Sequence, residues 1–169
     1  MNDLTLCFQD ALQVITLNAP GWEPGTLEIR GTGVRSKDGI WYFDPQDPDI
    51  TSGSYNIELV EVANNKVWQT LTVTVMQIEP TMKLASFNWT DIDNKQKRLH
   101  ARFESNTPNV DNWNWTVTYL GVPRNFNGSG FDIELDVDLS SVSAVELFVT
   151  LYATNSASGC GKMISQNFV

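Results

Sequence analysis

The residues of this chain that could do metal or acid–base chemistry are led by a run of carboxylates at alternate positions. Within the segment 131–139 they are Asp132, Glu134, Asp136 and Asp138. Alternate side chains of a β-strand share a face and lie about 6.5–7 Å apart along the backbone, which is too far for neighbours alone to enclose a calcium ion. The spacing therefore favours a structural role for this acidic ladder.

The single histidine, His100, limits the chemistry further. One histidine is too few for a two-histidine zinc or iron site. Alternation places His100 on one strand face with Arg98 and Arg102, and a flat strand face makes a poor catalytic pocket. We expect this basic face to lie opposite the acidic ladder in an antiparallel pair, where opposite charges stabilise the register.

Two acidic loops could hold calcium, and the sequence leaves both open. One contains Asp44 and Asp47, and the other contains Asp91 and Asp93. Carboxylates at these spacings suit Ca²⁺, but neither loop has the glycine and distal glutamate of an EF-hand. Asp side chains also cap turns, so turn roles are expected first.

No constellation in the sequence suggests catalysis. A nucleophile–base pair would have to use His100, and the run Gly31-Thr32-Gly33 is not followed by a helix N-terminus that could receive a phosphate. We therefore expect no catalytic residue, no cofactor and no bound metal. The protein is expected not to be an enzyme.

Hydrophobic periodicity places most of these residues on strands. Apolar and polar residues alternate in the segments 67–75, 131–139 and 145–153, and no helical stripe of similar strength occurs. Turn-forming pairs such as Ser52-Gly53 and Asn127-Gly128 separate such segments. The chain is predicted to be all-β.

A domain boundary is expected near the middle of the chain. The strand pattern stops at Val75, Pro80 cannot donate to a sheet, and a new β pattern starts at Met82. We predict two tandem immunoglobulin-like β-sandwiches, an immunoglobulin-like domain at residues 1–79 and a second one at residues 80–169.

Charge and composition limit the partners. A net charge of −9 over 169 residues repels nucleic acid. No apolar run approaches the roughly 18 residues of a membrane-spanning helix, so no membrane partner is expected. The segment 1–10 lacks a basic region followed by an apolar run, so no Sec export is expected, and Cys7 and Cys160 are predicted to be free thiols.

Several motifs recur in known domains. In the first half they are Gly31-Thr32-Gly33-Val34, Trp41-Tyr42-Phe43-Asp44-Pro45 and Ser52-Gly53-Ser54-Tyr55-Asn56-Ile57. These motifs resemble immunoglobulin-like repeats of Bacteroidetes surface proteins. In the second half, Asn112-Trp113-Asn114-Trp115-Thr116-Val117 and Ser158-Gly159-Cys160 resemble a PKD-type immunoglobulin-like domain, although Tyr119-Leu120-Gly121-Val122-Pro123 replaces its usual Gly-Asp-Gly turn. The resemblance implies tandem immunoglobulin-like and PKD-like domains, as in those surface proteins and in virion proteins of their phages.

Such folds host many functions, so function is a separate expectation. Virion proteins assemble in the host cytoplasm, which suits a leaderless chain with reduced cysteines. We therefore expect a non-enzymatic structural or binding protein of a phage virion, a capsid auxiliary or head-decoration protein. Its partners would be coat, portal or tail components, with host-surface glycans as a further candidate. The alternative is a bacterial cell-surface adhesion module or a carbohydrate-binding fragment.

Phe148 and Tyr152 are the candidate protein interface. They fall on the outward side of the predicted strand 145–153, where a solvated sheet would carry polar residues. Aromatic residues within a polar rim are typical of binding surfaces. The competing expectation is that the segment 120–130 folds over both rings and covers them.

The tryptophans leave glycan binding open, because indole rings stack well on sugars. Trp113 and Trp115 share a face with Val117 and are expected in a sandwich core. No such placement is evident for the remaining four, Trp22, Trp41, Trp68 and Trp89.

Overall fold

The computed structural model describes residues 3–16, 25–138, 140 and 144–169. All regular elements among these residues are β-strands, and none is a helix. The all-β prediction is confirmed, and the strands form sandwich-type pairs of sheets. The chain divides into two compact units, Met1–Gln77 and Ile78–Val169. The boundary predicted from the sequence falls two residues later.

The first unit contains two sheets. Its strands are β1 (Leu4–Cys7), β2 (Gln13–Ile15), β3 (Leu27–Arg30), β4 (Val34–Lys37), β5 (Ile40–Phe43), β6 (Gly53–Glu61) and β7 (Lys66–Met76). The sheet orders are β1-β7-β6-β3 and β2-β5-β4, with β1 parallel to β7. Side chains from both sheets, including Phe43, Ile57 and Val73, are fully buried in one core.

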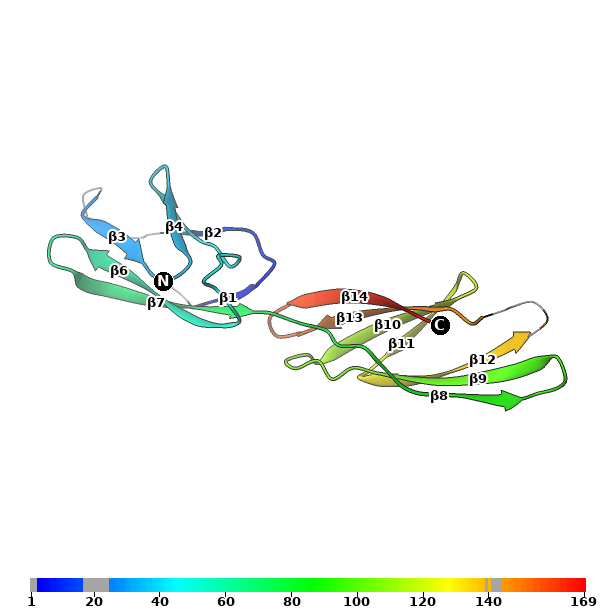
Figure 1. Cartoon of the computed structure of the whole chain (residues 1–169). Coiled ribbons are helices and arrows are strands. Elements are labelled where there is room, and N and C mark those ends of the chain that lie inside the picture. Colours follow the sequence, from blue (N-terminus) through cyan, green and yellow to red (C-terminus); the bar gives the residue numbers. More distant parts are fainter. Residues whose placement is uncertain (1–2, 17–24, 139, 141–143) are drawn as a thin grey trace. The chain divides into compact units, whose positions relative to one another are not determined.

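The second unit also contains two sheets (Figure 1). Its strands are β8 (Lys83–Asp91), β9 (Gln96–Glu104), β10 (Asn112–Tyr119), β11 (Val122–Asn127), β12 (Gly130–Asp138), β13 (Leu147–Thr154) and β14 (Gly161–Phe168). One layer has the order β12-β9-β8 and the other the order β11-β10-β13-β14. The alternation expected from the sequence is clearest in β12 and β13, whose residues are buried every second position.

An aromatic cluster lies between the two layers of the second unit. The ring of Phe131 contacts those of Trp115, Phe103 and Phe126, with centroids 5.2, 5.4 and 4.2 Å away. Trp115 is fully buried, and its indole N–H donates to the carbonyl of Gly128 at 2.8 Å. Burial of side chains of this size contributes on the order of 1.5–3 kcal/mol each, which makes this cluster a main source of stability. The expected core position of Trp115 is confirmed.

The turn that departs from the PKD pattern is a tight hairpin between β10 and β11. Tyr119 pairs with Val122, so only Leu120 and Gly121 lie between the strands. Their φ angles are 49° and 77°, the left-handed values that a two-residue hairpin requires at both positions. Glycine adopts this conformation without strain, and it lets the segment after the turn run back as β11.

The prediction of free thiols is wrong. Cys7 and Cys160, the two cysteines of the chain, are both disulfide-bonded. The prediction rested on the cysteines' separation in sequence and on an expected reducing compartment. Separation in the sequence does not exclude a disulfide, so the first of these two arguments fails.

Candidate interaction surface

The structure places Phe148 and Tyr152 on an open sheet face. β13 is an inner strand, paired with β10 on one side and β14 on the other, as expected from the sequence. The side chains of Phe148 and Tyr152 point away from the core and are 46% and 44% exposed. Four residues apart on one strand, they are separated by about 13 Å along the sheet.

The strand segment 122–127 does not cover these rings. It forms β11, which continues the same sheet on the far side of β10. The expectation that the segment 120–130 folds over Phe148 and Tyr152 is therefore wrong. The tight turn at Leu120 and Gly121 gives the physical reason, because it directs the chain back alongside β10.

Among the residues paired within this sheet, those that point outward around the two aromatics share one property: none carries a charge. We call this surface the neutral face. Cross-strand register assigns to it Asn112, Asn114, Thr116 and Thr118 from β10, Pro123, Asn125 and Asn127 from β11, Phe148, Thr150, Tyr152 and Thr154 from β13, and Gly161, Met163, Ser165 and Asn167 from β14. This uncharged surface is notable in a chain of net charge −9, and it ends at Glu146, which precedes β13 and lines a hollow with Phe148.

Hydroxyl and amide groups on the neutral face bond to one another across strands. The Thr116 hydroxyl donates to the Asn125 amide oxygen at 2.9 Å, and the Thr150 and Ser165 hydroxyls lie 2.9 Å apart. These bonds fix the side chains between Phe148 and Tyr152. The result is a flat and ordered field of neutral donors and acceptors with an aromatic ring toward each end.

The ring of Tyr152 lies over Gly161. A Cβ atom at Gly161 would come within 2.9 Å of the Tyr152 hydroxyl oxygen and 3.1 Å of its Cζ, and it would clash with Thr154 Cγ2. Only glycine leaves room for the ring to lie against the sheet at this position. The end of the ring thus lies against β14 while 44% of the residue stays exposed, which leaves aromatic surface for stacking on a ligand.

The opposite sheet has a very different outer surface, because it carries the acidic ladder. Register pairs Asp132 with Arg102, Glu134 with His100 and Asp136 with Arg98, as predicted from the sequence. Ion pairs join Arg102 to Asp132 at 2.8 Å and Arg98 to Asp136 at 2.7 Å, and His100 Nδ1 lies 3.1 Å from Glu134 Oε1. The hydrogen bond from Arg98 holds the pKa of Asp136 below its usual range, and the same bond raises the pKa of Arg98.

Both acidic loops use their carboxylates in turns. Asp47 accepts a hydrogen bond from the Asp49 backbone N–H and another from Arg35, each with a separate oxygen. These two bonds hold its pKa below the ordinary value, the first more strongly. Asp44 likewise accepts from the backbone N–H of Gln46. These contacts match the turn role expected for the first loop.

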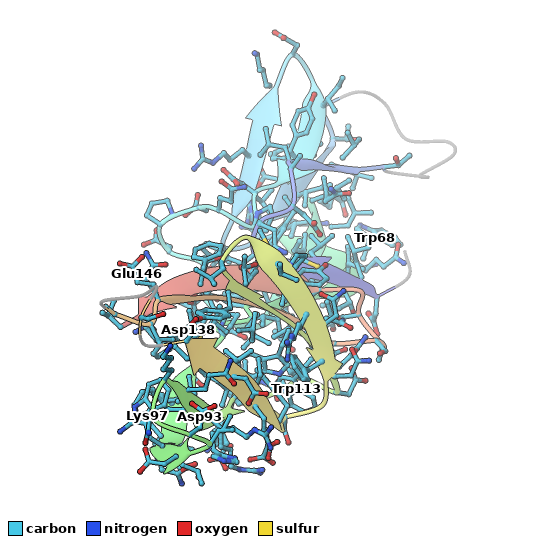
Figure 2. The ribbon with its side chains drawn as sticks, turned by 90° about the vertical axis from the view of Figure 1, so that its right-hand side faces the viewer. Trp68, Asp93, Lys97, Trp113, Asp138 and Glu146 are labelled. Atoms are coloured by element: carbon cyan, nitrogen blue, oxygen red, sulfur yellow. The ribbon has the colours of Figure 1, made fainter. Side chains whose placement is uncertain are left out.

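The second loop joins β8 to β9. Asp93 accepts hydrogen bonds from the backbone N–H groups of Lys95 and Gln96 at 2.7 and 2.8 Å, and Asp91 forms an ion pair with Lys97. Figure 2 labels Asp93 and Lys97 in the region of this turn. Within the described ranges, no group of three or more His, Cys, Asp or Glu residues is arranged to hold a metal ion. The same part of the chain contains no helix long and apolar enough to cross a membrane.

The tryptophans differ in their surroundings. Trp41 packs against the core of the first unit, whereas Trp68 is exposed beneath Lys66, whose Nζ lies 3.8 Å from the ring centroid. Trp89 is exposed on β8. Trp113 is partly buried, and its indole N–H is buried without a hydrogen-bond partner. Trp22 lies outside the described residues.

Sequence reasoning missed two parts of the surface. Gly161 and Met163 on β14 complete the neutral face beside Tyr152, and Phe87 on β8 is nearly half exposed although it faces the core side of its sheet. In the segment 161–168 apolar and polar residues do not alternate, since Met163 and Ile164 are adjacent, so its pattern carried no clear signal for β14. No signal in the sequence could show that the core side of β8 stays uncovered.

Comparisons with known proteins add little. No family model matches the chain, and no curated protein matches it. Among solved structures, the crystal structure of a DUF3823 family protein from Bacteroides ovatus is 14% identical over 92% of each chain, with a TM-score of 0.24. So low a TM-score carries no argument about this protein's function.

Proposed function

We propose that this chain is a non-enzymatic structural and binding protein that docks through the neutral face. The observation that carries the proposal is the exposure of Phe148 and Tyr152 on a sheet face without charge. Large aromatics surrounded by uncharged polar groups are the usual composition of binding hot spots. The assignment of the two units as immunoglobulin-like and PKD-like domains is part of the same proposal.

The setting we favour is the bacterial cell surface, where the chain would act as an adhesion module. The disulfide-bonded cysteines support this choice, because cytoplasmic thiols are kept reduced. A phage virion component, a capsid auxiliary or head-decoration protein, is the second candidate. A flat docking face on a small sandwich also suits a repeated particle lattice. In that setting coat, portal or tail components would be the partners.

Two ligand chemistries fit the neutral face. A protein partner would bury both aromatics in pockets. A neutral glycan would stack on the exposed face of Tyr152 and bond to the surrounding hydroxyls and amides. The Tyr152 ring over Gly161 favours the glycan specifically, because flat exposed rings suit the apolar faces of sugars.

Retention in the native setting tests the proposal. The double variant Phe148→Ser, Tyr152→Ser should keep the β-type circular dichroism spectrum and a melting temperature near wild type, because both side chains are exposed. It should be lost from the surface of intact cells, scored by cleavage with added protease, or from purified particles. Trp68→Ser is the matched control, since Trp68 is 47% exposed and lies in the other unit. Equal retention of all three proteins would refute the docking role.

Affinity electrophoresis through gels containing laminarin, arabinoxylan or mannan separates the two ligand chemistries. Retardation of the wild type that Tyr152→Ser abolishes and Trp68→Ser preserves identifies a neutral glycan. Unretarded migration in every gel, together with loss of the double variant from its native setting, identifies a protein partner.

A further inference from the structure

Strand β8 is an unprotected sheet edge. It ends the order β12-β9-β8 and pairs with β9 alone. Between described residues, no backbone hydrogen bond outside that pair involves its nine residues. Every second residue of β8 therefore presents its N–H and C=O groups outward, which is a template for another extended strand.

The core side of β8 is apolar and uncovered. Phe87 pairs with Ala101 and Trp89 with Leu99, so both aromatics share a face with side chains that are almost fully buried. Phe87 and Trp89 are nevertheless 46% and 37% exposed, and their rings meet edge to face at 5.8 Å. The opposite layer thus covers β9 and leaves the edge strand open.

An apolar groove runs beside these rings. It has a volume of about 240 Å³ and is lined by Leu84, Phe87, Val145, Leu147, Phe168 and Val169. The lining comes from β8 on one side and from the ends of β13 and β14 on the other. Side chains of a strand added to β8 would enter this groove from the core side of the sheet.

Soluble proteins usually protect such an edge with inward-pointing charges, prolines or bulges. β8 has one bulge near its start, between Leu84 and Ser86, and its segment 86–90 contains neither charge nor proline. A regular edge with two exposed aromatics is therefore a surface for strand addition.

The charges at the two ends of β8 indicate which strand is added. Lys83 begins the strand, and Asp91 and Asp93 lie at its other end, where Asp91 also pairs with Lys97. A second copy running antiparallel would set each Lys83 against the acidic end of the other strand, whereas a parallel copy would set like charges together. In a pairing centred on Asn88, Phe87 of each copy also faces Trp89 of the other, and aromatic cross-strand pairs are stabilising.

We propose that β8 pairs antiparallel with β8 of a second copy, centred on Asn88, to form a symmetric dimer with one continuous sheet. The interface is isologous, because the same strand serves both sides. Phe87 and Trp89 of both copies then lie together on the core side of the joined sheet, where they cover the Phe87 end of the groove in each copy. This pairing is independent of the neutral face and of what binds there.

Sedimentation velocity over a concentration series tests the dimer. Wild type should show a reversible monomer–dimer equilibrium. Trp89→Lys should raise the dimer dissociation constant about 100-fold or more, because it buries a charge among apolar rings. Lys83→Glu, at an exposed position, should weaken the dimer less, and added salt should strengthen this variant's dimer because salt screens the like charges that then face each other. Phe148→Lys is the matched control and should leave the equilibrium unchanged, since Phe148 is as exposed as Phe87.

Cross-linking tests the register. Both native cysteines are disulfide-bonded, so Asn88→Cys would supply the one free thiol of each chain. A short bismaleimide should then link two copies, and the same treatment of Asn114→Cys on the neutral face should not. The proposal fails if wild type is monomeric at every concentration, if it binds only an unrelated protein through β8, if Trp89→Lys leaves the dimer intact, or if Asn114→Cys cross-links in place of Asn88→Cys.

Discussion

Arg98 holds Asp136 with both ends of its guanidinium: Nε donates to Oδ1 at 2.7 Å and Nη2 to Oδ2 at 3.2 Å. The two residues are direct cross-strand partners in β9 and β12. A bidentate pair of this kind uses both carboxylate oxygens, so Asp136 is committed to its neighbour. Cross-strand pairing with basic residues accounts for Asp132, Glu134 and Asp136 of the acidic ladder, whereas Asp138 lies opposite Gln96 and accepts hydrogen bonds from Ser140.

This pair should make stability depend on pH in acid. Because the pKa of Asp136 is lower in the folded chain than its ordinary value of 3.8, the pair stabilises the fold above that value. Its contribution is lost as the pH falls through the folded pKa. Arg98→Gln should therefore destabilise the protein at about pH 7 and should destabilise it less at about pH 2. Urea unfolding at both pH values checks this, and equal destabilisation at both would contradict it.

Charge reversal on the acidic ladder should have a small effect. Glu134→Lys with Asp136→Lys places like charges opposite Arg98 and His100, but all these groups are exposed and screened. We expect the melting temperature to fall by less than about 5 °C. Added calcium should change the melting temperature of neither protein. A calcium-dependent rise that only wild type shows would indicate a metal site instead.

The features predicted correctly from the sequence depend on local alternation. In β12 each apolar residue from Phe131 to Val137 is buried and each acidic residue is exposed, because a period of two fixes the face whatever lies beyond the sheet. Its partner strand was also predictable, since Arg98 and Arg102 offered the only matching row of positive charge nearby.

The missed features depend on how far one layer extends over another. Phe87 and Leu99 both point to the core side of their sheet, yet one is exposed and the other buried, because the opposite layer ends between them. Gly161 could not be recognised from the sequence for a similar reason, because its role is to leave room for the ring of Tyr152 on the neighbouring strand. Both features depend on contacts between strands that are distant in the sequence, and the residue pattern along one strand cannot predict such contacts.

Trp113 and Trp115 should respond differently to the same substitution. Trp115→Phe removes the hydrogen bond to Gly128 and should lower the free energy of unfolding by about 1–3 kcal/mol. Trp113→Phe removes a buried N–H that has no partner, so it should be neutral or slightly stabilising. Urea denaturation followed by circular dichroism compares them. A larger loss at Trp113 than at Trp115 would be inconsistent with these surroundings.

Thiol titration should find no free cysteine in native or denatured protein. Both cysteines are disulfide-bonded, so reaction with a thiol reagent under denaturing conditions should appear only after reduction, and then count two per chain. Reduction should also lower stability, on the order of 2–4 kcal/mol for a typical disulfide. Two thiols in unreduced, freshly purified protein would restore the prediction made from the sequence.

Gly161→Ala should impair the neutral face while leaving the sheet intact. The added Cβ would meet Thr154 Cγ2 at 2.4 Å and the Tyr152 hydroxyl and Cζ at 2.9 and 3.1 Å, so the Thr154 side chain must rotate and the Tyr152 ring must turn away from the sheet. The atoms displaced are the ends of side chains, and the backbone has no need to move. Binding through Tyr152 should therefore fall roughly as far as in Tyr152→Ser, with little loss of melting temperature.

The matched control is Ser165→Ala, which changes a small residue on the same strand and the same face. It removes one hydroxyl that bonds to Thr150 and leaves Tyr152 untouched. Nuclear Overhauser contacts between the Tyr152 ring and the α-protons of residue 161 should be present in wild type and Ser165→Ala and absent in Gly161→Ala. If Gly161→Ala loses those contacts but keeps full binding, the ring's position over Gly161 is not what the ligand or partner recognises.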